Sequence, residues 1–167
     1  MKRQGTFLLI AMLVVMVFNF TPAQPATALS ADVVISQVYG GGGNTGATYT
    51  HDFIELFNRG TSPLSLSGWS IQYASTTGVF GAYDNMRTEL PNVILEPGQY
   101  YLVQEAKGAG GTTPLPSPDL IDYSPIAMSA TGAKVALVNG VAPLACGSST
   151  VPCTAAQLAL MIDLIGW

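Results

Sequence analysis

Residues 52–69, DFIELFNRGTSPLSLSGW, decide the fold. In the first part of this stretch, Ile54 and Leu56 fall on one face of an extended strand and Glu55 falls on the other. A turn rich in Gly, Ser and Pro follows, where the backbone bends easily. The stretch ends at Trp69, which begins a second alternating segment, WSIQY. Two short alternating strands joined by a turn predict an all-β fold with Trp69 in its core.

Short strands are predicted along the rest of the chain, separated by Gly- and Pro-rich turns. They are expected at residues 32–39, 92–95, 100–105, 134–138 and 163–165, with an edge segment at 123–129, a hairpin partner at 141–144 and one or two helical turns at 154–161. The expected core between two sheets consists of Ile54, Leu56, Trp69, Ile71, Leu102, Val135 and Leu137.

Three segments resemble the lamin tail domain: FIELFN followed by LSGW in residues 53–69, LEPGQYYLV at 95–103 and KVALV at 134–138. The resemblance extends from about residue 32 to the end of the chain. It implies an immunoglobulin-like β-sandwich that acts through surface contacts. Bacterial domains of this type are found attached to secreted nucleases and phosphodiesterases of the endonuclease/exonuclease/phosphatase kind. The motifs are specific for the fold and carry little information about chemistry.

The N-terminus has the pattern of a secretory signal peptide. Lys2 and Arg3 precede an apolar run at residues 7–18, and the small-residue pattern Ala26-Thr27-Ala28 follows. The run is shorter than the roughly 20 residues that a membrane-spanning helix needs. We predict a signal peptide over residues 1–28, cleaved after Ala28, with a second site at LSA, residues 29–31. The product is secreted, extracellular or periplasmic, without a membrane anchor.

Cleavage leaves residues 29–167, or 167 − 28 = 139 residues, which is enough for one domain. This part keeps four of the six basic residues and all ten acidic ones, a formal charge of 4 − 10 = −6. The four basic residues are scattered, so generic nucleic-acid binding is not expected. The acidic balance also argues against binding to anionic lipid. The apolar end at Gly166-Trp167 indicates a domain truncated at its C-terminus or cut from a larger protein.

The chain has two cysteines, Cys146 and Cys153, both in the part expected to be exported. Their spacing is not C-x-x-C and the single histidine, His51, is distant in sequence, which argues against a metal or redox pair. In an oxidising compartment, we predict a structural disulfide between them.

Candidates for chemistry are few. His51, Asp52 and Glu55 could form a metal or acid–base cluster, but residues three apart on a strand point to opposite faces. We therefore interpret them as a polar entry to the strand, with Glu55 facing solvent. Asp119 and Asp122 could ligate calcium, and the sequence leaves that question open. We expect no enzyme activity in this chain, no catalytic residue, no metal and no cofactor.

A glycine-rich loop, residues 40–46, places Gly41, Gly43 and Gly46 in the order G-x-G-x-x-G. That motif binds a dinucleotide only when a helix opens directly behind it. Another strand follows here instead, so we interpret the match as coincidental.

Two classes of function are consistent with these features. The first is a secreted binding or targeting module that contacts a protein or a cell-surface glycan through the long loops at residues 40–50 and 74–87. Tyr49, Phe80 and Tyr83 would be its anchors, because aromatic side chains combine apolar area with a polar tip. The alternative is an N-terminal accessory domain of a longer secreted nuclease or phosphodiesterase.

Overall fold

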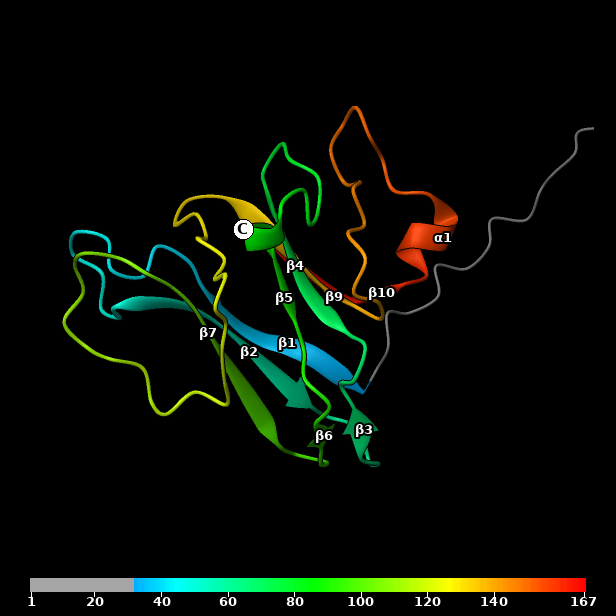
Figure 1. Ribbon diagram of the computed structural model, residues 1–167, viewed down its shortest axis with the longest axis horizontal. Coiled ribbons are helices and arrows are strands. Elements are labelled where there is room, and N and C mark those ends of the chain that lie inside the picture. The colour runs from blue at the N-terminus through cyan, green and yellow to red at the C-terminus, as the bar shows by residue number, and fades with distance from the viewer. Residues whose placement is uncertain (1–31) are drawn as a thin grey trace, which may run out of the picture.

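Two four-stranded sheets form the framework of residues 32–167, the part of the chain that this computed structural model describes (Figure 1). The first sheet has the order β1-β2-β7-β8. Its strands are β1 (Val33–Tyr39), β2 (His51–Asn58), β7 (Tyr100–Lys107) and β8 (Leu120–Ile121). The predicted signal peptide, residues 1–28, lies outside the described residues.

The second sheet has the order β10-β9-β4-β5. Its strands are β10 (Met161–Gly166), β9 (Ala133–Val138), β4 (Ser70–Ser75) and β5 (Arg87–Glu89). A small two-stranded antiparallel sheet, β3 (Leu64–Ser65) and β6 (Ile94–Leu95), lies at one end of the molecule (Figure 1). The all-β, immunoglobulin-like sandwich expected from the sequence is therefore confirmed.

Helix is scarce in this part of the chain. It comprises the 3₁₀ turn η1 (Asp84–Met86) and the single α-helical turn α1 (Ala155–Leu158), which a Thr154–Gln157 capping box begins. Among residues 32–167, no helix has the length and apolar character needed to cross a membrane.

One apolar core lies between the two sheets, and the alternation in the sequence predicts most of it. Ile54, Leu56, Ile71, Val135 and Leu137 are fully buried, and Trp69 is nearly so. The prediction for Leu102 is wrong. Its neighbours Tyr101 and Val103 point into the core instead, which leaves Leu102 half-buried on the outer face of β7.

The outer face of the second sheet is covered as well. Residues 140–153 cross it and bury a second apolar cluster, in which Phe80 and Leu144 pack over Ala136 and Val138. Ser70 and Gln72 of β4 therefore point away from the main core but are fully buried. The covering segment contains the Cys146–Cys153 disulfide, which confirms the predicted pairing.

Two predicted strands are absent from the described residues. Residues 123–129 have no regular structure, and the short strand beside β7 is β8, two residues earlier. Residues 141–144 are not the hairpin partner of β9, because they belong to the covering segment. The partner of β9 is β10. Here tertiary contacts override the local turn signal at Asn139-Gly140.

Trp69 is the largest side chain in the main core, and its replacement tests the sandwich. We expect Trp69→Ala to lower the free energy of unfolding by about 3 to 5 kcal/mol, as large aromatic truncations in cores do. Chemical denaturation monitored by circular dichroism measures this. Leu102→Ala, on the half-buried outer face, is the control and should cost clearly less. Equal unfolding midpoints for Trp69→Ala and the parent protein would contradict the assignment.

Candidate functional site

A surface hollow of about 380 Å³ lies between the loop after β4 and the tip of the disulfide loop. Both loops extend from the same end of the second sheet (Figure 1). Hydroxyl-bearing side chains line it together with apolar ones, and no charged side chain does. The hydroxyl groups belong to Ser75, Thr77, Tyr83, Ser148 and Thr150, and the apolar side chains to Val79, Ala82, Met86 and Val151. We call this site the loop hollow.

The two walls of the loop hollow are fastened to each other. The backbone N–H of Phe80 donates to the carbonyl of Cys146 at 2.8 Å, and Ala145 N–H donates to the carbonyl of Phe80 at 3.0 Å. The Lys134 ammonium donates to the carbonyl of Gly147 and lies 5.5 Å from the centre of the Phe80 ring. Gly147 has φ of 109°, and a Cβ there would lie 2.8 Å from that ring. Only glycine fits this close approach.

The three predicted anchor residues have different environments. Tyr83 lines the loop hollow and its side chain is 69% exposed. Phe80 is 2% exposed, so the expectation that it is a surface anchor is wrong. Its ring is buried beneath the disulfide loop, more than 60 residues later in the sequence. Tyr49 does not line this hollow.

Tyr49 belongs to an aromatic cluster on the outer face of the first sheet. Its ring packs edge-on against Tyr39 and Phe53, at centroid distances of 5.3 and 5.6 Å. The rings of Tyr39 and Phe53 stack on each other at 5.5 Å. The Tyr39 hydroxyl accepts the backbone N–H of Thr48. A binding role for Tyr49 and for Tyr83 stays a prediction.

The structure separates the three residues considered as a catalytic cluster. Glu55 accepts a 2.6 Å hydrogen bond from the exposed Ser36 hydroxyl, whereas Asp52 is 3% exposed. The two carboxylates therefore point to opposite faces, as expected. His51 Nδ1 lies 2.9 Å from Thr50 Oγ1, and burial followed by the positive charge of Lys107 lowers the His51 pKa.

Asp52 is not the polar strand entry that we expected, because its side chain holds two loops. Its carboxylate accepts the backbone N–H groups of Gly42 at 2.5 Å and of Met128 at 2.6 Å. Burial raises the pKa of Asp52, although these backbone hydrogen bonds act in the opposite direction. Every oxygen of Asp52 therefore has a structural partner.

Glu105 of β7 is a second buried carboxyl group on the core face of the first sheet. It is 2% exposed, accepts the backbone N–H of Ile126 at 2.7 Å, and lies 2.7 Å from the Thr88 hydroxyl, which donates to it. Burial raises its pKa to about 8. Glu105 was not among the predicted site residues, although its alternation with Tyr101 and Val103 predicts the same face.

Asp119 and Asp122 also bind backbone groups. Asp119 accepts the N–H of Leu102 at 2.7 Å, and Asp122 accepts the N–H of Ser124 at 3.0 Å. Among residues 32–167, no cluster of three or more His, Cys, Asp or Glu side chains is arranged to hold a metal ion.

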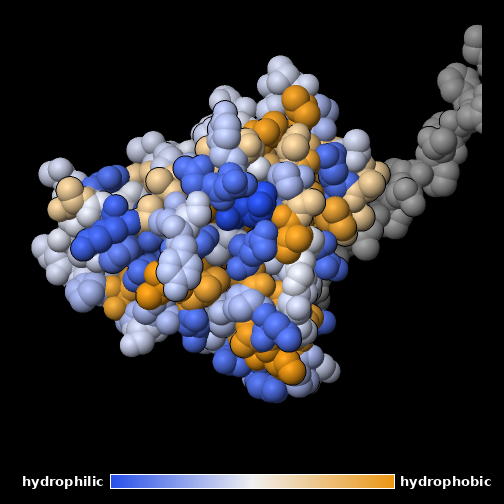
Figure 2. Space-filling model, in the orientation of Figure 1, coloured by the Kyte–Doolittle hydropathy of each residue, from blue (hydrophilic) through white to orange (hydrophobic). Residues whose placement is uncertain are grey.

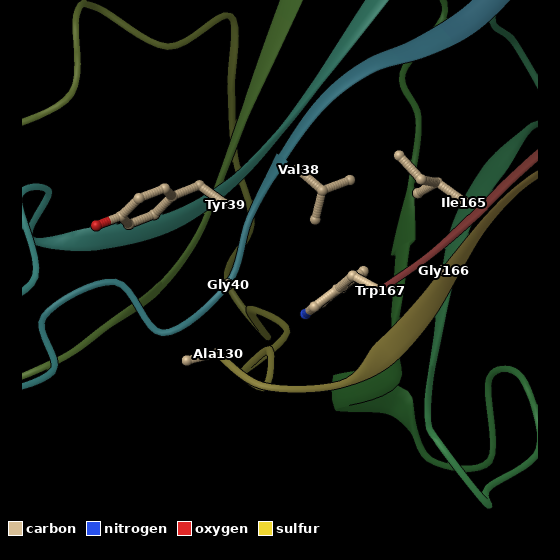
Figure 3. Close-up of a pocket in the computed structure, with 7 residues that line it drawn as sticks. All are labelled: Val38, Tyr39, Gly40, Ala130, Ile165, Gly166 and Trp167. Atoms are coloured by element: carbon tan, nitrogen blue, oxygen red, sulfur yellow. The ribbon is translucent and has the colours of Figure 1, made fainter.

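A second hollow of about 320 Å³ lies between β1 and β10, at the edges of the two sheets (Figure 3). Val38 and Ile165 extend toward each other from these strands, and Trp167 lies beside them. The Trp167 indole N–H donates to the carbonyl of Ser129 at 3.1 Å. Tyr39, Gly40, Ala130 and Gly166 complete the lining. We call this site the edge hollow.

Exposed apolar side chains are distributed over several regions of the surface. On the face in Figure 2, apolar patches alternate with polar ones, and one lies over β3 and β6, where Ile94 is exposed. Leu158 of α1, Leu160 and Leu164 of β10 are exposed as well. The surface therefore does not single out one site, and the hollows are the better candidates.

Two facing four-stranded sheets are the architecture of an immunoglobulin-like module. The family model of the lamin tail domain matches residues 26–148, which is most of the chain. The protein therefore belongs to the lamin tail domain family, a non-catalytic immunoglobulin-like class. No curated protein matches the chain.

The raised pKa of Glu105 predicts how the free energy of unfolding depends on pH. The native state keeps a proton that the unfolded chain loses above its ordinary pKa of 4.5, so the free energy of unfolding should fall as the pH rises from about 4.5 to about 8. In Glu105→Gln this part of the decline should disappear, because the amide stays neutral. Its oxygen can accept the Ile126 N–H, and its NH2 group can donate to the Thr88 hydroxyl, which then accepts instead of donating. Urea denaturation across this pH range measures the difference.

The raised pKa of Asp52 also makes the free energy of unfolding fall as the pH rises. Asp52 is present in both the parent protein and Glu105→Gln, so the difference between their pH profiles reports on Glu105. Glu89→Gln, at an exposed position of β5, is the control and should leave the Glu105 contribution in place. Parallel pH profiles for Glu105→Gln and the parent protein would show that Glu105 is not protonated in the native state.

Proposed function

We propose that this protein is a secreted, non-catalytic binding module that holds an uncharged glycan in the loop hollow. One observation carries the proposal: five hydroxyl-bearing side chains and no charged one line a hollow of about 380 Å³. Hydroxyl groups both donate and accept hydrogen bonds, so they pair with the hydroxyl groups of a sugar in either direction. The volume lies in the range of small-ligand pockets.

Tyr83 supplies the apolar contact that a sugar ring needs. Its side chain is 69% exposed at the rim, and Met86 and Val151 extend the apolar surface beside it. Aromatic side chains provide a large contact area at low cost in conformational entropy. A protein partner is the other class of ligand that these loops could bind, and the binding experiment below distinguishes the two.

The disulfide supports both the binding role and export. It holds the tip of the covering segment, where Ser148 and Thr150 lie 3.2 Å apart at their hydroxyl oxygens. A wall fixed before the ligand arrives lowers the entropic cost of binding. Disulfides persist mainly in oxidising compartments. This agrees with the signal peptide predicted over residues 1–28, and we propose an extracellular or periplasmic location.

Replacement of Tyr83 tests the binding site. We expect purified residues 29–167 to bind neutral oligosaccharides on a glycan array, and Tyr83→Ala to weaken the strongest interaction by about tenfold, or about 1.4 kcal/mol, in titration calorimetry. The matched control is Tyr123→Ala, because Tyr123 is fully exposed and lies outside both hollows. That variant should bind like the parent protein.

Two results would contradict the proposal. One is the absence of binding to any neutral glycan, and the other is equal affinity for Tyr83→Ala and the parent protein. Selective capture of a protein that Tyr83→Ala no longer captures would replace the glycan with a protein partner at the same hollow.

We also propose that the module is an accessory domain of a longer secreted nuclease or phosphodiesterase. The support is the resemblance of the FIELFN and LSGW segments to bacterial lamin tail domains that accompany such enzymes. In that arrangement the catalytic residues lie in another domain, and this chain supplies attachment. Its acidic balance of −6 over residues 29–167 indicates that the module itself does not hold the nucleic acid.

The accessory role predicts an inactive module. We expect purified residues 29–167 to show no nuclease, phosphodiesterase or phosphatase turnover with divalent metal, because both oxygens of Asp52 accept backbone hydrogen bonds inside the fold. Metal-dependent turnover that disappears in His51→Ala and in Asp52→Asn would contradict this. Glu55→Gln is the control for surface charge.

A further inference from the structure

The edge hollow lies between two strands that each have only one neighbour. In the described part of the chain, β1 pairs only with β2, and β10 pairs only with β9. Both are therefore edge strands, one in each sheet, and they border the hollow from opposite sides (Figure 3). An edge strand offers a row of unpaired N–H and C=O groups to another chain.

The register shows which backbone groups of β10 are free. Trp167 and Ala133 exchange both backbone hydrogen bonds, each at 3.1 Å. Because hydrogen-bonded pairs alternate along an antiparallel ladder, Ile165 also bonds to β9, while the N–H and C=O groups of Leu164 and Gly166 point away from it. The Leu164 N–H is not free, because it donates to the Asp163 carboxylate beside it at 2.9 Å. The Leu164 C=O group and the N–H and C=O groups of Gly166 are therefore the ones left for another chain.

The same reasoning applies to β1. Asn58 of β2 bonds toward the β7 side, so Phe53 of β2 bonds toward β1 and pairs with Tyr39. Val38, the neighbour of Tyr39, therefore directs its N–H and C=O groups away from β2, toward the hollow. Both margins of the hollow present backbone groups suited to an added strand.

Side chains bound the edge hollow at both ends. Asp163 of β10 accepts the backbone N–H of Ile35 of β1 at 2.8 Å, which joins the two edges at one end. At the other end, Val38, Ile165 and Trp167 form an apolar wall (Figure 3). No charged side chain lines the hollow. Each edge strand has a bulge, between Ile35 and Gln37 in β1 and between Met161 and Asp163 in β10, but neither carries the lysine or proline that often protects an edge.

We propose that the edge hollow binds one extended peptide segment of a partner protein by strand addition, with an uncharged apolar side chain of the peptide between Val38, Ile165 and Trp167. Backbone hydrogen bonds supply affinity in this mode, and the side-chain pocket supplies specificity. The hollow lies between two edges of one molecule, and its volume of about 320 Å³ has room for one short chain segment. A folded second copy would bring a whole sheet with its edge. This site is separate from the loop hollow and does not depend on the glycan proposal.

The test is a matched pair of substitutions at Gly166. Gly166→Pro removes the free N–H without touching the bonds to β9, which Ile165 and Trp167 make, and proline is tolerated on the solvent side of an edge strand. Gly166→Ala keeps the N–H, and a Cβ there lies 3.6 Å or more from its neighbours. Random linear peptides displayed on phage are selected on the parent protein, and the affinity of the enriched peptides is measured for both variants.

We expect enriched peptides to lose about tenfold or more in affinity for Gly166→Pro and less than about twofold for Gly166→Ala. The amide signals of Val38 and Gly166 should shift in nuclear magnetic resonance spectra when the peptide is added. Trp167→Ala should also weaken binding, and it tests the apolar wall if the proline variant does not fold.

Three results would overturn the proposal. They are no peptide enrichment, enriched peptides that bind Gly166→Pro as well as the parent protein, and amide shifts confined to other strands. If light scattering instead shows a dimer that Gly166→Pro dissociates, the occupant is a second copy, and the peptide proposal is wrong.

Discussion

The structure depends on hydrogen bonds between buried polar side chains of the strands and the backbone of the loops. Asp52 binds the N–H groups of Gly42 and Met128, and Glu105 binds that of Ile126. Gln72 does the same on the other sheet, where it accepts from Leu144 and donates to the carbonyl of Ala142. An unmet buried polar group costs about 1 to 3 kcal/mol, so strand and loop stabilise each other.

This arrangement explains how a small sandwich carries long irregular segments. The segment before β9 crosses from the first sheet to the second and has almost no regular structure, but Asp52 and Glu105 hold its backbone. The segment after β9 covers the second sheet, where Gln72 and the disulfide hold it. The edge hollow adjoins the first segment and the loop hollow adjoins the second. Both candidate sites therefore have rigid support.

The strands and the main core were predictable because they follow local alternation. Ile54 and Leu56 share one face of β2, and the same alternation places Ile71 of β4 and Trp69, just before that strand, inside. The prediction for Leu102 was wrong, since the aromatic run at Tyr100 and Tyr101 gives no clear sign of which residue points inward. Asp52 lies two residues before Ile54 and on the same face of β2, so the alternation also predicts that Asp52 is buried.

The loop contacts were not predictable from sequence patterns. Phe80 lies in a glycine-containing loop that has the composition of an exposed segment, and residues 144–146 bury it. No periodicity links segments that are more than 60 residues apart. The loop hollow exists only because those segments meet, so of its lining only Tyr83 was a candidate. The edge hollow depends in the same way on the pairing of β10 with β9.

Native-state hydrogen exchange at the loop amides tests most directly whether buried side chains hold the loops. The amide protons of Ile126, Met128 and Leu144 lie outside the strands and donate to Glu105, Asp52 and Gln72. They should exchange as slowly as amides of the central strands β2 and β4, and Asp52→Ala should release Met128 selectively. Exchange of all three at the rate of an unstructured chain would contradict this explanation of the structure.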